Sequence, residues 1–382
     1  MVILFAASSA RLVLLFLAVH SHGGTKEFLY FNDTVRYWQE ALALLSGDFS
    51  PSVLYDVPLY PLFLRAFFGW LGPHRLLPSL LNLPLFAFSA FLVRRLATRI
   101  SGPRSALSAT ALYAFYPTLL VYSILPFSEC LYLSLFLSSY LLYLRCLDSP
   151  TQAGLLPSAA LLGLASLTKE VAVLLPLAYF PLLAFRPAPR HAAKIVTLFL
   201  AVYLTVLSPL FLLRAYEGRG WSLSEKAADC AGIIQRHLKI SPLRYTADYG
   251  RRHFNFYFGT GLVTAMKLWG ADAPPLKRAN ANPLRTFDTL KRTAPEWAAY
   301  QISAHLYTAV TYFLAVFSLA MFFRKRRFRT IAELCLPVVY FIVIYFFLTI
   351  ADTNARYSMP ALPFLCILAG SASMHGSFGR RS

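Results

Sequence analysis

Charged side chains stand at the ends of several apolar runs of this sequence, where they could carry out chemistry beside a lipid. Asp33 follows the first apolar run after a short polar stretch, and Glu129 opens another run just after Pro126. A carboxylate can take up a proton from a substrate or ligate a divalent cation. Lys169 lies in a turn between two runs, and Arg356 begins the last run. Either cation could bind a phosphate, and a guanidinium can do so with two parallel hydrogen bonds.

Neighbouring polar side chains extend this set. A helix is predicted to begin at Asp33. Residues three or four positions apart share a helix face, so Arg36, Tyr37 and Glu40 are expected on the side of Asp33. In the last apolar run, Tyr357 follows Arg356 directly.

Purely structural interpretations of these residues stay open. Asp33, or Asn32 before it, could cap the helix that follows. Glu129 could be a charge at a helix N-terminus that the helix dipole favours. Arg356 could reach the lipid headgroups, with Tyr357 in the interfacial aromatic belt.

Other polar residues are expected to be solvated or structural. Lys169 could pair only with its neighbour Glu170 or with water. Four arginines of the long polar segment are expected to be solvated: Arg214, Arg244, Arg251 and Arg252. The candidate histidines, which share no i, i+4 spacing and lack an acidic residue to complete a set, are His237, His253 and His305. The five cysteines show no zinc-ligand spacing, so the residues predict no metal site.

The elements that must position the candidate residues are membrane-spanning helices. The chain has 382 residues and is 57% hydrophobic and only 14% charged, whereas soluble proteins carry about 25% charged residues. Apolar runs long enough for the roughly 30 Å hydrocarbon core recur from end to end. The net charge of +19 is divided among short loops, unlike the basic face of a nucleic-acid-binding module. We expect an all-α integral membrane protein that contacts lipids and not nucleic acid.

About ten membrane-spanning helices are predicted from these runs. The first is interpreted as a retained span and not as a signal peptide, because Arg11 lies in its middle and no clear cleavage site follows. The predicted spans are 2–19, 76–93, 106–124, 130–144, 154–167, 171–185, 195–213, 300–323, 331–350 and 357–371. Alternate loops are basic, including the RKRRFR run at 324–329, which places both chain ends in the cytoplasm.

Three parts are expected along the chain. Residues 1–213 form an N-terminal transmembrane module whose first outer loop, 20–75, includes a short helix at 58–71 lying at the membrane surface. Residues 214–299 form a long outer loop, and residues 300–382 form a C-terminal transmembrane module. The candidate residues all fall on the outer side of the predicted spans.

Three stretches of the sequence resemble the GT-C superfamily of membrane glycosyltransferases, in particular its protein-mannosyltransferase and aminoarabinose-transferase type. The family's first outer loop is similar to FNDTVRYWQEALALLSGDF and the following YDVPLYPLFLRAFF. Its paired inner spans resemble YSILPFSECLYLSLFLSSYLLYL and LLGLASLTKEVAVLLPLAY. Its R-Y-x-x-P-x-x-P closing span is similar to ARYSMPALPFLCILAG. Asn32 departs from the pattern, since many members have an adjacent acidic pair there.

The resemblance implies a glycosyltransferase that inverts the anomeric carbon. Its donor would be a polyprenyl or dolichyl phosphate carrying one sugar, and its acceptor an unspecified glycan, lipid or protein. Asp33 corresponds to the family's catalytic base, and Glu129 to a second acidic position that could orient the acceptor or ligate a divalent ion. Substrate-binding roles follow for Tyr37, Lys169, Arg356 and Tyr357.

The expected location is a bacterial plasma membrane, with the endoplasmic reticulum as the alternative, and the active site would face away from the cytoplasm. Two other classes stay open: a multi-pass transporter or flippase of lipid-linked saccharides, and a non-catalytic scaffold. A transporter predicts polar residues in mid-span and paired halves. Here the charges gather at span ends and no repeat is visible. A divalent metal ion is the one cofactor left open.

Overall fold

The computed structural model of the chain consists of helices in all the parts that it describes. The described residues are 2–24, 26–31, 33–54, 57–148, 154–185, 192–216, 266, 291, 295–348 and 359–375. The longer helices are α1 (Val2–Ser21), α5 (Leu77–Ala114), α7 (Glu129–Asp148), α10 (Ala192–Tyr216), α16 (Pro295–Arg324) and α17 (Phe328–Leu348). The shorter elements are η1 (Glu27–Leu29), α2 (Asp33–Leu45), α3 (Pro51–Leu54), α4 (Leu59–Leu71), α6 (Pro117–Tyr122), α8 (Leu155–Thr168), η2 (Glu170–Ala172), α9 (Pro176–Tyr179), η3 (Phe180–Phe185) and α18 (Leu362–His375).

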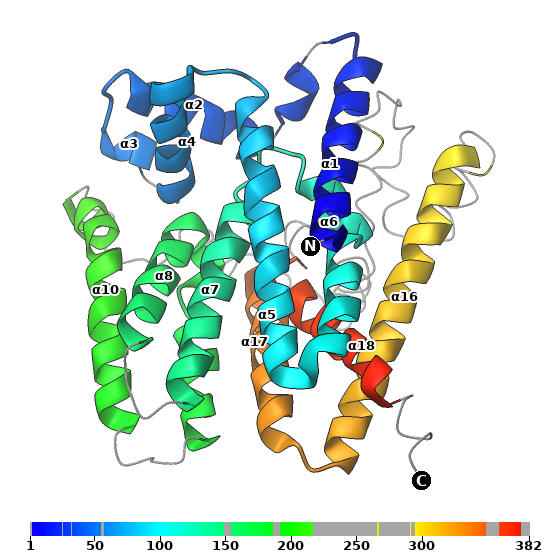
Figure 1. Ribbon diagram of the computed structural model, residues 1–382. Helices are drawn as coiled ribbons and strands as arrows, with labels where there is room; N and C mark the ends of the chain where they lie inside the picture. The colour runs from blue at the N-terminus through cyan, green and yellow to red at the C-terminus, as the bar shows by residue number, and fades with distance from the viewer. Residues whose placement is uncertain are drawn as a thin grey trace, which may run out of the picture.

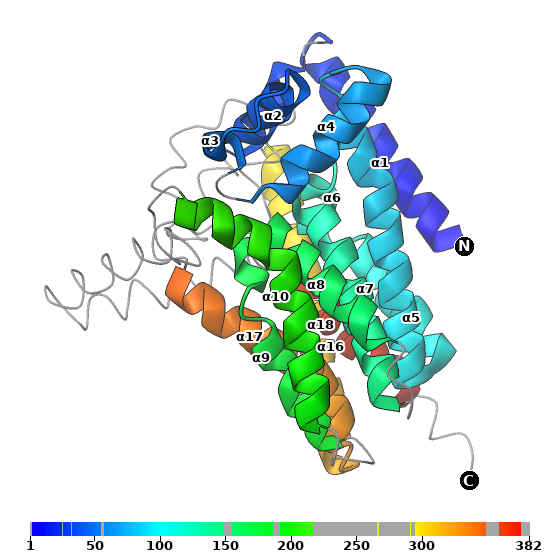
Figure 2. The ribbon, with the colours of Figure 1, turned by 90° about the vertical axis from the view of Figure 1, so that its left-hand side faces the viewer.

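Five of the described helices, α1, α5, α7, α10 and α16, are long and apolar enough to cross a membrane. Their outward sides carry exposed large apolar side chains such as Phe5, Phe16 and Phe313, which water would disfavour and lipid accepts. Most of α7 is buried instead, and it lies among the other helices in Figures 1 and 2. The chain is therefore an integral membrane protein, and the predicted all-helical multi-pass architecture is confirmed.

The predicted count of about ten spans is not confirmed. The predicted span at 76–93 lies in the first part of α5, and the start of the predicted span at 106–124 lies in its last part, beyond a bend at Gly102. Gly102 has a φ of 84°, a left-handed conformation that glycine adopts without steric cost. The second of these predicted spans is interrupted again after Ala114, before α6 begins at Pro117.

Other predicted spans are shorter or broken. The run at 171–185 is divided among η2, α9 and η3, because Pro176 and Pro181 lack the backbone N–H that a continuous helix needs. The helices α8 and α18 have 14 residues each, which is about 21 Å of helix. That length is less than the roughly 30 Å core.

The predicted helical loop after the first span is confirmed as α2, α3 and α4, which lie together at one end of the bundle in both views (Figures 1 and 2). The buried side of α2 repeats at helical spacing and consists of Thr34, Tyr37, Trp38, Ala41 and Leu44. It packs on α4, where the ring centroids of Trp38 and Phe68 are 4.9 Å apart. We call this end of the bundle the α2–α4 end.

The C-terminal helix α18 is packed against α5, α16 and α17, and every described side chain from Leu362 to Ser371 is buried. A Cβ placed on Gly370 would be 2.5 Å from the backbone nitrogen of Ala109 in α5. The two helices therefore touch almost backbone to backbone, a contact that small residues permit between helices in lipid.

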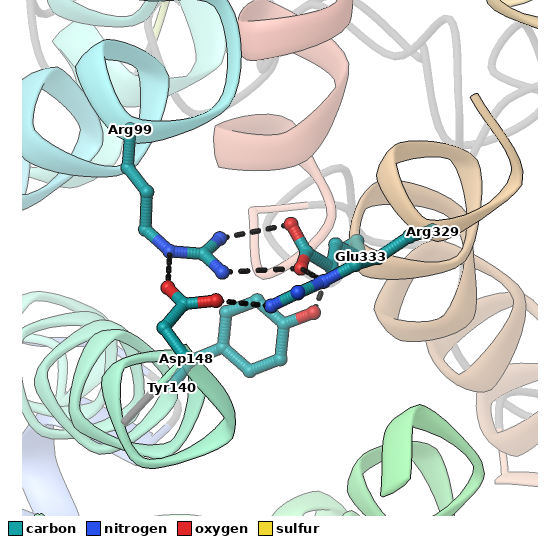
Figure 3. A network of polar contacts seen from close by, with 5 residues as sticks. All are labelled: Arg99, Tyr140, Asp148, Arg329 and Glu333. Carbon is teal, nitrogen blue, oxygen red and sulfur yellow. Dashed lines mark hydrogen bonds and ion pairs between the residues drawn. The ribbon is translucent and has the colours of Figure 1, made fainter. Parts of the chain in front are cut away.

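A network of ion pairs joins three helices (Figure 3). It lies at the end opposite α2–α4, since it includes Asp148, the last residue of α7, whose first residue is Glu129. The guanidinium of Arg99 in α5 donates to both carboxylate oxygens of Glu333 in α17, at 2.8 and 3.1 Å, and its Nε lies 2.9 Å from Asp148 in α7. Arg329 binds Asp148 and the same Glu333. Tyr140 donates to the backbone carbonyl of Glu333 at 2.5 Å. These contacts connect α5, α7 and α17.

Candidate active site at the α2–α4 end

The side chain of Tyr37 joins α2 to the start of α7. It lies on the buried face of α2, and its hydroxyl oxygen is 3.4 Å from Oγ of Ser128. Ser128 directly precedes Glu129, the first residue of α7. The ring of Tyr37 packs edge-on against Tyr60 of α4, with centroids 5.1 Å apart. The amphipathic pattern of α2 thus places the helix that begins at Asp33 against the N-terminus of α7.

Two carboxylates act on the hydroxyl of Tyr37. Burial raises the pKa of Tyr37 well above its usual value, and the negative charges of Asp33 and then Glu129 raise it further. Both carboxylates are therefore close enough to disfavour a phenolate. Tyr37 stays neutral near pH 7, and its hydroxyl can both donate and accept a hydrogen bond.

A buried ion pair joins Glu129 to Lys169. The Nζ of Lys169 lies 2.7 Å from Oε1 of Glu129, and the two side chains are 13% and 2% exposed. Helix α8 ends at Thr168, where Lys169 turns into an extended conformation (φ −150°, ψ 123°). Removing one partner of such a pair costs about 3–5 kcal/mol. The pair therefore fixes the end of α8 against the start of α7.

A second ion pair continues from the first. Glu170 lies 3.5 Å from a terminal guanidinium nitrogen of Arg214, whose side chain is only 6% exposed. The prediction that Arg214 is solvated is therefore wrong. Helix α10 continues to Tyr216, beyond the predicted span end at 213, so Arg214 belongs to its last turn and faces the bundle. Two ion pairs, Glu129 with Lys169 and Glu170 with Arg214, thus lie next to each other at this end of the molecule.

Four of the six predicted site residues are brought together at the α2–α4 end: Asp33, Tyr37, Glu129 and Lys169. Arg356 and Tyr357 lie outside the described residues. The predicted shared face of Arg36 and Glu40 is confirmed by their ion pair, in which Nε and Oε1 are 3.7 Å apart. The catalytic and binding roles of all these residues stay predictions.

The donor set does not fit a divalent metal ion. Among the described residues there is no group of three or more His, Cys, Asp or Glu side chains that could hold one. Glu129, the carboxylate expected to be a ligand, has the ammonium group of Lys169 on its Oε1. A cation on that oxygen would displace Lys169 and meet its charge.

Three residues that contact or belong to the chain segment just before Glu129 were not among the predicted site residues: Arg11, Asn82 and Ser128. Ser128 carries no pattern that could have singled it out. Arg11 and Asn82 could have been singled out, because each is a strongly polar side chain in the middle of an apolar run. Such residues are costly at membrane depth and are functional candidates for that reason. Both are fully buried.

The arrangement of helices is similar to that of a solved structure. The crystal structure of ArnT from Cupriavidus metallidurans bound to undecaprenyl phosphate matches with a TM-score of 0.53 and 16% sequence identity. The match covers 99% of this chain and 60% of ArnT. The chain therefore has an ArnT-like fold.

The likeness to ArnT, an aminoarabinose transferase, agrees with the resemblance found in the three sequence stretches. The chain spans 60% of the length of ArnT, and at 16% identity the likeness establishes the fold alone. No protein-family profile and no curated protein matches the sequence. The activity must therefore be argued from the residues at the α2–α4 end.

Proposed function

We propose that the chain is a glycosyltransferase that moves one sugar from a polyprenyl- or dolichyl-phosphate carrier to an acceptor on the non-cytoplasmic side of the membrane. The observation that carries the proposal is the convergence of Asp33, Tyr37 and the Glu129–Lys169 pair at one end of a GT-C-like bundle. The ArnT structure of this fold has undecaprenyl phosphate bound, a lipid of the class proposed here as the carrier. The acceptor is a glycan, a lipid or a protein.

The reaction proposed is a single displacement at the anomeric carbon. An acceptor hydroxyl attacks that carbon, the bond from the carbon to the phosphate oxygen breaks, and the electron pair leaves on the polyprenyl phosphate. Asp33 takes the proton of the attacking hydroxyl as general base. Because attack and departure occur on opposite faces of one carbon, the configuration inverts.

Positive charge at the site would hold the departing phosphate. The ammonium group of Lys169 has three N–H groups, one of which binds Glu129, and in this proposal it also faces the phosphate. Glu129 fixes that ammonium and can orient the acceptor. In this proposal the guanidinium group of Arg356 donates two hydrogen bonds to the phosphate, with Tyr357 beside it. Donors placed where charge develops supply much of the stabilisation in such transfers.

The proposed orientation puts the α2–α4 end outside a bacterial plasma membrane. Its support is the charge of the turn between α16 and α17, which lies at the opposite end and carries four exposed basic residues: Arg324, Lys325, Arg326 and Arg327. Short basic loops face the cytoplasm. In the domain arrangement we propose, the 1–213 module carries the site, the 214–299 loop lies outside, and the 300–382 module completes the bundle.

The variant Asp33→Asn tests the proposal. It keeps the size of the side chain and removes the base, so transfer from polyprenyl-phosphate sugars is expected to fall by about 10²–10⁴-fold, while the protein still inserts and folds. The assay measures sugar transfer by purified protein reconstituted in lipid, with membranes that lack the gene as the source of acceptor.

Asp48→Asn is the matched control for this experiment. Asp48 belongs to the same helical loop, is exposed, and accepts hydrogen bonds from nearby Ser50, whose backbone nitrogen is 2.9 Å away. Transfer by Asp48→Asn is expected to match the wild type within about twofold. Full transfer activity of Asp33→Asn would rule out the mechanism as written.

A further inference from the structure

The chain segment that leads into Glu129 lacks regular secondary structure. Helix α6 ends at Tyr122 and α7 begins at Glu129, and the segment 123–128 between them is fully buried. Its internal backbone bonds are few, such as the one from Phe127 to the carbonyl of Leu125 at 2.8 Å. Buried carbonyl groups outside a helix need donors from elsewhere. We call this segment the 123–128 turn.

Asn82 of α5 supplies two of these bonds. Its side-chain nitrogen donates to the carbonyls of Leu125 and Phe127, at 2.5 and 3.1 Å. Among the described residues, Oδ1 of this fully buried side chain has no hydrogen-bond partner. An unsatisfied buried oxygen costs free energy, so an apolar residue would suit the packing of α5 better. The amide at this position is explained by the two hydrogen bonds that its nitrogen donates to carbonyl groups of the 123–128 turn.

Arg11 of α1 holds the other end of the turn. Its Nε donates to Oγ of Ser123 at 2.7 Å, and one terminal nitrogen donates to the carbonyl of Ala114 at 2.8 Å. The other terminal nitrogen donates to Ala7 of its own helix at 3.0 Å. The guanidinium carbon lies 3.4 Å from the ring centre of Phe86. Arg11 thus joins α1 to the end of α5 and to the first residue of the turn.

We propose that Asn82 and Arg11 are positioning residues of the candidate active site. They act through the 123–128 turn, because its last residue, Ser128, meets Tyr37, and the next residue, Glu129, meets Lys169. Neither Asn82 nor Arg11 touches a reacting atom in this account. The proposal rests on the proposed function for its catalytic consequence and on the turn alone for its structural consequence.

The structural consequence can be measured without any activity. In a background whose five native cysteines are replaced by alanine, Ser128→Cys reports opening of the turn by its rate of maleimide labelling. Asn82→Ala is expected to raise that rate about tenfold, as local opening becomes easier. Ser89→Ala is the matched control: Ser89 is also a buried hydrogen-bonding residue of α5, bound to Phe86 and Tyr113 and not to the turn.

The catalytic consequence is a loss of kcat that depends on Glu129. Asn82→Ala is expected to lower kcat about tenfold with the KM for the lipid donor within about twofold. In a Glu129→Gln background the same substitution is expected to lower kcat by less than about twofold, since two residues acting through one contact are not additive. A general loss of folding would lower kcat by the same factor in both backgrounds.

Ser123→Ala is a second, milder variant, because it removes only the oxygen that accepts from Arg11. It is expected to raise the labelling rate and lower kcat by about threefold each. Unchanged labelling in both Asn82→Ala and Ser123→Ala would overturn the proposal. So would an equal loss of kcat in both Glu129 backgrounds. Absence of transfer by the wild type would contradict the proposed function instead, and the labelling result would still decide the role of the turn.

Discussion

Among single residues, Tyr37 is the contact between the two halves of the candidate site. Its hydroxyl lies beside Ser128, and the charges of Asp33 and Glu129 both act on it. A neutral phenol can both donate and accept a hydrogen bond, whereas Glu129 is held by Lys169. The different environments of the two carboxylates support different roles in the proposed reaction.

Lys169→Met tests the ion pair with Glu129. The substitution leaves a buried carboxylate without its cation, so the free energy of unfolding is expected to fall by about 3–5 kcal/mol. Sugar transfer is also expected to fall, because the ammonium group that is proposed to hold the phosphate is lost. Thermal unfolding in detergent and transfer kinetics measure the two effects.

The double variant Glu129→Gln with Lys169→Met separates these effects. It removes both charges, so it should recover most of the lost stability, whereas transfer should stay low. Equal stability of the single and double variants would argue against a stabilising ion pair at this position.

At the scale of elements, the site depends on helix ends and not on helix middles. Asp33 begins α2, Glu129 begins α7, Lys169 follows α8 and Arg214 lies in the last turn of α10. These ends meet only if the bundle is packed correctly, and one close helix contact is that of α18 on α5. The contact of Gly370 with Ala109 therefore determines how closely the C-terminal helix approaches α5.

Gly370→Ala tests this helix contact. The added methyl group would lie 2.5 Å from a backbone nitrogen of α5, so the helices must separate, at a cost of about 1–3 kcal/mol. Gly69→Ala is the control, since its methyl group would meet only Leu45 at an ordinary 3.9 Å. Thermal unfolding of both variants measures the difference. Equal melting temperatures would contradict the close contact of α5 and α18.

At the scale of the whole molecule, the two ends of the bundle have different chemistry. The α2–α4 end carries the candidate site, and the opposite end carries the network of Figure 3. Helix α7 connects them, since Glu129 and Asp148 are its first and last residues, about 30 Å apart. We interpret the network as a structural closure of the end opposite the candidate site.

Glu333→Gln tests that interpretation. Glu333 is 5% exposed and pairs with both Arg99 and Arg329, so losing its charge is expected to cost about 3–5 kcal/mol of stability. Asp148→Asn is the matched control, because Asp148 is 44% exposed and its pairs should contribute only about 0–1 kcal/mol. Thermal unfolding in detergent compares the two variants. A Glu333→Gln protein as stable as the wild type would contradict the interpretation.

The sequence predicted the helical membrane class and four of the site positions, because apolar length and helix-end charges are local properties. Asp33 and Glu129 could be found from their places beside apolar runs. The ion pairs between helices could not be found from the sequence. The contact of Arg214 with Glu170, for example, depends on where distant helices end. Broken spans such as 171–185 also exceed what hydropathy alone can predict, because prolines interrupt a run without changing its apolar character.

The central claim is that the protein breaks the bond between a sugar and a lipid phosphate. The most direct test incubates purified protein in lipid vesicles with a polyprenyl-phosphate sugar and acceptor membranes, and then measures the mass of the donor lipid. We predict that the donor loses one glycosyl unit with the wild type and keeps it with Asp33→Asn. A donor that stays chemically intact with the wild type, yet moves from one leaflet to the other, would contradict the claim and indicate a flippase.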